Sequence, residues 1–151
     1  MKLYNNFLTN DECDSFLNYA ISNFEIDSRT YYGWHARTNR SSKFESVIID
    51  KIKSISPYNP FQISWINLAE YENGRELLPH YDERSKYTFT IVLTSGYDGG
   101  DFQIEDNIYK LKRGDCIGFN GNSLLHGVLP VTNGYRASLN IWIKPGEKNI
   151  L

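Results

Sequence analysis

The sequence predicts one mainly β domain with helices at its N-terminal end, of the β-sandwich or jelly-roll type. Its length of 151 residues fits a single domain of ordinary size. Aromatic residues, which favour strands, make up 15% of the chain. Two helical patterns come first, and many short strand patterns with turns follow them. We therefore expect a single domain over 1–151, with a helical part over 1–57 and a β core over 61–144.

Composition excludes several classes of protein. The 16 basic and 18 acidic residues give a net charge of −2, which argues against a general nucleic-acid coat. No apolar run approaches the roughly 20 residues of a membrane span, and the first residues do not resemble a signal peptide. The two cysteines, Cys13 and Cys116, are too few for a disulfide scaffold and are expected to be buried free thiols. These features favour a cytoplasmic protein without membrane contact.

Two helices are predicted before the first strand. Thr9 and Glu12 have the spacing of a capping box, and apolar residues then recur at helical spacing over 13–24. A second helix is expected from about Ser42 and stops before Pro57.

The strand patterns define two faces of a sheet. Residues 61–71 are extended in character, and residues 86–94 alternate between apolar and polar or small side chains. The last strand, 135–144, also alternates. One of its faces is apolar and can pack against the helices, whereas the other carries Arg136, Ser138, Asn140 and Trp142.

Three residues have the chemistry of an iron site. His80 and Asp82 are two positions apart, so on an extended backbone both side chains point to the same face. His126 follows after several strand patterns, and a jelly roll can bring it beside the first pair. Two histidines and one carboxylate form the facial triad of non-haem Fe(II) oxygenases.

Arg136 predicts the cosubstrate. An arginine on the inward face of a strand is costly unless an anion pairs with it. 2-Oxoglutarate fits, because its 2-oxo acid end can chelate iron while its distal carboxylate reaches Arg136, and Ser138 can add a hydroxyl donor. The alternative is a salt bridge from Arg136 to an internal Asp or Glu.

The motifs around these residues resemble those of a known family. Tyr71-Glu72-Asn73-Gly74 followed by His80-Tyr81-Asp82 is similar to the pattern of prolyl 4-hydroxylase-like Fe(II)/2-oxoglutarate dioxygenases. The second half of the chain most resembles the bacterial PKHD-type hydroxylases of that group. The matching stretches there are 97–101, 112–115 and 123–136.

The resemblance implies a double-stranded β-helix (jelly roll, cupin-like) core. It implies that His80, Asp82 and His126 hold Fe(II), that Arg136 binds the distal carboxylate of 2-oxoglutarate, and that the Tyr71 hydroxyl lies near the cosubstrate or substrate. It further implies consumption of O2, release of succinate and CO2, and ascorbate as a reductant that rescues over-oxidised iron. The substrate it suggests is a prolyl or other amino-acid side chain.

A substrate loop is predicted ahead of the second helix. Residues 28–43 join two helical patterns, and this connection mixes aromatic and basic side chains. We expect Trp34, Arg37 and Arg40 to contact the substrate. The alternative is a solvated loop without a role.

Two other functions remain open from the sequence alone. A non-catalytic cupin-like module would keep the triad but bind no 2-oxo acid, and Arg136 speaks against it. A nucleic-acid demethylase of the same superfamily could use Arg37, Arg40 and Lys43 on phosphates. That subclass has a second arginine on the last strand, which 137–142 lacks, so nucleic acid is disfavoured. A peptide, a protein or a small molecule all remain open as substrate, and so does the oligomeric state.

Overall fold

The structure is a computed structural model that describes residues 1–27, 35–83 and 85–147. Two helices and thirteen strands are found in these ranges. The helices are α1 (Asn10–Asn23) and α2 (Ser42–Ile52). The strands are β1 (Lys2–Tyr4), β2 (Glu25–Asp27), β3 (His35–Thr38), β4 (Phe61–Tyr71), β5 (Leu77–His80), β6 (Tyr87–Val92), β7 (Asp98–Gly99), β8 (Phe102–Ile104), β9 (Asn107–Tyr109), β10 (Cys116–Phe119), β11 (His126–Val128), β12 (Val131–Asn133) and β13 (Arg136–Pro145).

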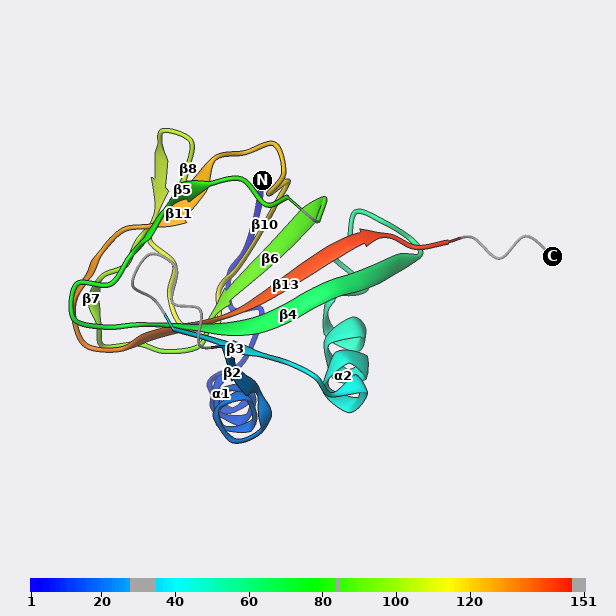
Figure 1. Cartoon of the computed structure of the whole chain (residues 1–151), viewed down its shortest axis with the longest axis horizontal. Helices are drawn as coiled ribbons and strands as arrows, with labels where there is room; N and C mark the ends of the chain where they lie inside the picture. Colours follow the sequence, from blue (N-terminus) through cyan, green and yellow to red (C-terminus); the bar gives the residue numbers. More distant parts are fainter. Residues whose placement is uncertain (28–34, 84, 148–151) are drawn as a thin grey trace.

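Two antiparallel sheets form the β core, as expected for a jelly roll. The larger has seven strands in the order β1-β10-β6-β13-β4-β3-β2, and the smaller has four in the order β5-β11-β8-β9. Strands β12 and β7 form a third sheet of two strands. Figure 1 shows both helices below the large sheet and the small sheet on its other side. The predicted mainly β fold with N-terminal helices is confirmed.

Local signals explain where both helices begin. Thr9 Oγ1 accepts a hydrogen bond from the Glu12 amide at 3.1 Å, and Glu12 Oε1 accepts one from the Thr9 amide at 3.1 Å. This is the predicted capping box. At α2, Ser41 Oγ accepts a bond from the Phe44 amide at 3.4 Å. Each cap satisfies amides that lack a partner inside the helix.

The large sheet separates two apolar cores. On the helix side, apolar residues of β4, β6 and β13 pack with buried residues of α1 and α2, including Cys13, Ala20 and Ile48. Residues on the other face of the same strands, such as Ala69 and Val92, pack against the small sheet. The predicted alternation of β13 is confirmed, because Ala137, Leu139, Ile141 and Ile143 all belong to the helix-side core.

The predicted loop over 28–43 is wrong for its second half. Residues 35–38 form β3, which pairs with β2 on one side and β4 on the other. α2 then starts at Ser42. The four residues of β3 carry too little periodicity to predict a strand. In the structure β3 pairs with β4 and so extends the large sheet. The N-terminal part also contributes β1, which pairs with β10.

Two further expectations concern the chain as a whole. Cys13 and Cys116 are both buried and free, as predicted. Within the described ranges, neither helix is long and apolar enough to cross a membrane.

Candidate active site

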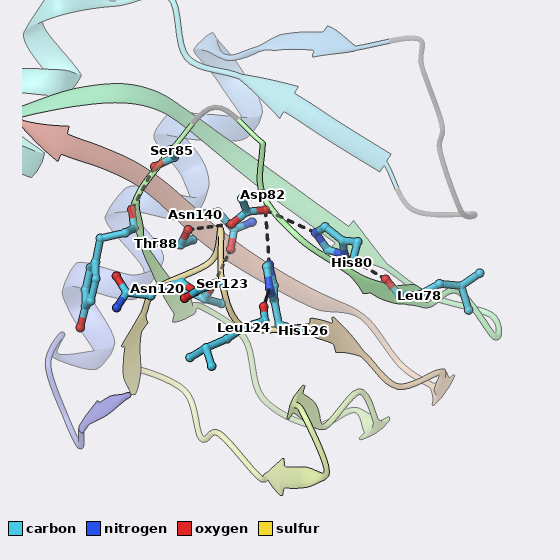
Figure 2. Close-up of polar contacts among 12 residues, drawn as sticks. Leu78, His80, Asp82, Ser85, Thr88, Asn120, Ser123, Leu124, His126 and Asn140 are labelled. Atoms are coloured by element: carbon cyan, nitrogen blue, oxygen red, sulfur yellow. Dashed lines mark hydrogen bonds and ion pairs between the residues drawn. The ribbon is translucent and has the colours of Figure 1, made fainter.

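The backbone brings the three predicted metal ligands together at one end of the small sheet. β5 and β11 are antiparallel neighbours, and His80 is the direct partner of His126 in their register. Asp82 lies just beyond the end of β5. Its amide donates a hydrogen bond to the Gly121 carbonyl at 2.9 Å, which holds this turn against the β10–β11 connection. Figure 2 shows the three side chains pointing toward one another.

The geometry of the three side chains suits a metal ion. Their ligand atoms all lie within 4.8 Å of one another. Asp82 Oδ1 lies 3.5 Å from His80 Nε2 and 3.3 Å from His126 Nε2. The other ring nitrogens lie 2.9 Å from the Leu78 carbonyl and 2.8 Å from the Leu124 carbonyl. Because carbonyls accept, each Nδ1 carries the proton in the neutral ring, which leaves the Nε2 lone pairs facing the centre.

The electrostatics of the triad keep the carboxylate ionised. Burial raises the pKa of Asp82, but its interactions with the protonated forms of His126 and His80 and the hydrogen bond from Thr88 outweigh burial and hold that pKa well below its usual range. For His80, burial lowers the pKa, while the hydrogen bond and charge of Asp82 and the bond to Leu78 raise it above the ordinary value. An ionised carboxylate between two neutral imidazoles is a ligand set that binds divalent cations such as Fe(II).

Arg136 lies fully buried on the inner face of β13 and has vacant donors. Its exposed fraction is 0%, and its partner across the strands is Tyr71 of β4. Nη1 donates to Ser138 Oγ at 3.4 Å, and the guanidinium carbon lies 5.3 Å from the Tyr71 ring centre. Among the described residues, Arg136 Nε and Nη2 have no hydrogen-bond partner. Nor does Arg136 pair with an acid in this part of the chain, contrary to the internal salt-bridge alternative.

These vacant donors fit a carboxylate. A buried guanidinium without a counter-charge is unfavourable, and two adjacent N–H groups match the two oxygens of one carboxylate. Burial raises the pKa of Tyr71 far above its usual range, although the charge of Arg136 opposes it. Tyr71 therefore keeps its proton. The structure thus brings Arg136, Ser138 and Tyr71 together.

The inner face changes character along β4 and β13. Beyond the Arg136 end comes a polar pair, in which Asn140 Nδ2 donates to Asn67 Oδ1 at 2.9 Å. Asn140 Oδ1 also accepts from Thr90 Oγ1 on β6 at 2.9 Å. The next cross-strand pair is Trp65 and Trp142, whose ring centres lie 5.3 Å apart. Trp65 is 44% exposed, so the inner face is closed at Arg136 and open to solvent at this tryptophan pair.

The tryptophan pair is linked to the triad through Thr88. Trp142 is the direct β6–β13 partner of Thr88, and Thr88 Oγ1 donates to Asp82 Oδ2 at 2.8 Å. Sequence reasoning placed Trp142 on the inner face but gave no role to Trp65 or Thr88. The sequence shows Trp65 only as an aromatic residue within a predicted strand. Its position opposite Trp142 is known only from the pairing of β4 with β13.

The predicted substrate loop divides between described and undescribed residues. Trp34 lies outside the described residues. Arg37 belongs to β3 and forms an ion pair with Glu70. Arg40 pairs with Glu25 at 3.3 Å. The two arginines therefore bind acids of neighbouring strands, and the structure does not bring either of them to the triad.

Comparison with known proteins identifies the same family that the sequence motifs resemble. Residues 66–144, slightly more than half of the chain, match the family described as the 2OG-Fe(II) oxygenase superfamily. A PKHD-type hydroxylase of Rippkaea orientalis is 29% identical over 97% of this chain and 82% of the relative. A second one, from Maricaulis maris, is 29% identical over 64% of this chain, which spans only 52% of that relative.

Solved structures share the fold. A viral collagen prolyl hydroxylase from Paramecium bursaria Chlorella virus-1, in complex with 2-oxoglutarate, matches with a TM-score of 0.74 at 20% identity, over 97% of this chain and 96% of that one. A prolyl hydroxylase from Trichoplax adhaerens, in complex with a peptide fragment of hypoxia inducible factor, matches with a TM-score of 0.70 at 15% identity, over 94% and 82%. With the triad and the buried arginine in place, the family match means that this chain belongs to the 2OG-Fe(II) oxygenase superfamily and is a 2-oxoglutarate-dependent oxygenase.

Proposed function

We propose that this oxygenase hydroxylates a C–H bond of a prolyl or other amino-acid side chain in a peptide or protein. The reaction converts the C–H bond, 2-oxoglutarate and O2 into C–OH, succinate and CO2. In this proposal His80, Asp82 and His126 hold Fe(II), and Arg136 with Ser138 binds the distal carboxylate of 2-oxoglutarate. The iron, when bound, supplies the oxygen activation that no side chain can perform.

The buried arginine carries this proposal. Two of its nitrogens have no hydrogen-bond partner among the residues that the structure describes, and they lie on the same inner face of the large sheet as Thr88, the neighbour of Asp82. The bond to Ser138 directs the guanidinium along β13 toward the triad end, because Ser138 is two residues nearer to it. A dicarboxylate that reaches from Arg136 to the metal satisfies both groups. A cupin-like module without a cosubstrate would leave this cation buried and unpaired, at a cost in stability.

The open end of the inner face supports a peptide or protein substrate. Trp65 and Trp142 offer an aromatic surface beside the triad, which suits an aliphatic ring or another apolar side chain. Relatives of this chain are named PKHD-type hydroxylases, and the similar Trichoplax structure holds a peptide. The nucleic-acid alternative loses its support, because Arg37 and Arg40 are already paired with Glu70 and Glu25.

Two finer features belong to the same proposal. Ascorbate sustains turnover by reducing iron that has been over-oxidised in uncoupled cycles, so activity without it should decline with time. The cytoplasm is the proposed location, because both cysteines are free and buried, as is typical of proteins in reducing compartments.

The test of this function begins with an anaerobic titration. Fe(II) and then 2-oxoglutarate are added to the wild-type protein, and the visible charge-transfer band is followed. We expect the band in the wild type and its loss in His126→Ala, which should remain folded because both apolar cores stay intact. Full iron binding by His126→Ala would contradict the metal assignment. Succinate release against a panel of proline-containing and proline-free peptides then identifies the substrate.

A further inference from the structure

The two oxygens of Asp82 have different partners. Oδ1 faces both histidines, at 3.5 Å from His80 Nε2 and 3.3 Å from His126 Nε2. Oδ2 instead accepts a hydrogen bond from Thr88 Oγ1 at 2.8 Å. Figure 2 shows Thr88 on the side of Asp82 away from the histidine rings. Only Oδ1 is therefore presented to the metal position.

A glycine closes the space behind this carboxylate. A Cβ added to Gly121 would lie 2.1 Å from Asp82 Oδ2 and 2.7 Å from Thr88 Oγ1. Both contacts are far shorter than van der Waals distance, so no larger residue fits without moving the carboxylate or the hydroxyl. The Gly121 carbonyl also accepts the Asp82 amide at 2.9 Å. Gly121 thus holds the Asp82 backbone and leaves room for its side chain.

Thr88 is fixed more firmly than an exposed hydroxyl would be. It is 2% exposed and lies within β6, a strand that pairs with β13 on one side and β10 on the other. A β-branched side chain in a central strand has few rotamers, so the direction of its hydroxyl is set by the fold. Because the hydroxyl donates to Oδ2, rotation of the carboxylate would break a buried hydrogen bond.

We propose that Thr88 and Gly121 are positioning residues that hold Asp82 to one-oxygen ligation of the iron. This inference rests on the proposed function. A carboxylate can bind a metal through one oxygen or both. If Asp82 used both, it would take one of the open positions that the 2-oxo acid and O2 need. The Thr88 hydroxyl and the absence of a Gly121 side chain together keep that position free.

The test compares Thr88→Val, which has nearly the same shape without the hydroxyl, with Thr88→Ser, which keeps it. Metal affinity is measured anaerobically with Fe(II) alone, and the charge-transfer band is measured after addition of 2-oxoglutarate. We expect Thr88→Val to change the dissociation constant for Fe(II) by about tenfold or more and to lose or shift the charge-transfer band. Mutation of residues that hydrogen-bond to metal ligands typically changes metal affinity or activity by about 10–100-fold. Thr88→Ser should restore both properties. Thr132→Val, at an exposed threonine of β12, is the matched control and should resemble the wild type.

A second variant guards against misfolding of the first. Gly121→Ala forces Asp82 Oδ2 away without removing any hydrogen-bonding group, and it should weaken Fe(II) binding and alter the band even if Thr88→Val does not fold. Wild-type Fe(II) affinity and an unchanged band in folded Thr88→Val, or in Gly121→Ala, would overturn the inference and leave the proposed function standing. Failure of the wild type itself to bind Fe(II) would overturn both.

Discussion

At the scale of single residues, the site consists of a few polar groups whose partners are set by the backbone. His80 and His126 each direct Nε2 to the centre because a carbonyl two residues upstream binds Nδ1. Arg136 is the opposite case, because two of its nitrogens lack a partner among the described residues. Within this part of the chain, the histidines have their hydrogen bonds, whereas the buried guanidinium has nitrogens free to donate, so the site can bind an anion at Arg136.

Arg136→Ala should raise the apparent KM for 2-oxoglutarate by roughly 10- to 100-fold, because a hydrogen-bonded charge pair contributes about 1.5–3 kcal/mol. Arg136→Lys should recover only part of this loss, since an ammonium cannot bind both carboxylate oxygens in a fork. Succinate formation at varied 2-oxoglutarate measures the effect. Fe(II) affinity without cosubstrate is the control and should not change. An unaltered KM in Arg136→Ala would remove the cosubstrate assignment.

At the scale of secondary-structure elements, β13 serves both a core and the site. β13 contributes Leu139 and Ile141 to the helix-side core, while Arg136 and Ser138 face inward. The turn at β7 supports this arrangement: a Cβ on Gly100 would lie 2.8 Å from Arg136 Cδ, and its φ of +71° also favours glycine. This close approach gives a physical role to Gly100, which lies in the stretch 97–101 that matches the family.

Helix α1 provides a test of stability that is separate from the site. Thr9→Ala removes the side-chain acceptor of its N-cap and should lower the free energy of unfolding by about 1 kcal/mol. Urea denaturation measures this change. The apparent KM for 2-oxoglutarate should stay at the wild-type value, because α1 packs on the face of the large sheet opposite to Arg136. A free energy of unfolding equal to that of the wild type would show that the capping box does not stabilise α1.

At the scale of the whole molecule, the inner face of the large sheet runs from a buried end to an exposed one. Arg136 and Tyr71 are buried at one end, Asn67 and Asn140 lie between, and the tryptophan pair meets solvent. The order is consistent with the reaction proposed, in which the cosubstrate would be enclosed at Arg136 and the substrate would enter where Trp65 is exposed. Exposed aromatic surface beside a reactive centre is a common means of binding an apolar group.

Trp65→Ala should therefore impair substrate binding without affecting the cosubstrate. We expect the KM for an accepted peptide to rise about three- to tenfold, in line with the roughly 0.5–1.5 kcal/mol of an aromatic contact. The KM for 2-oxoglutarate and the succinate formed without substrate should not change. Ile26→Ala is the control, because Ile26 is also exposed, at 68%, but lies on the edge strand β2. Equal peptide KM values in Trp65→Ala and the wild type would place the substrate elsewhere.

The sequence by itself determined the mainly β fold, both helices, the long strands and the set of His80, Asp82, His126 and Arg136. These features depend on local periodicity, caps and rare residue types in strongly alternating strands, all of which can be read without knowing the fold. The family motifs added the expected place of Tyr71, the use of ascorbate and the type of substrate. Strand β3 was missed because its four residues carry little periodicity.

Only the tertiary structure decided which groups meet across strands. The pairing of Trp65 with Trp142 depends on the register of β4 and β13, and a shift of one residue would turn either ring to the other face. The contact of Thr88 with Asp82 depends on how the end of β5 packs against β6. The pairing of Arg37 with Glu70 depends on β3 joining the sheet, and it removed this arginine from the predicted substrate contacts. Such contacts depend on how strands pair and pack, so local patterns in the sequence cannot specify them.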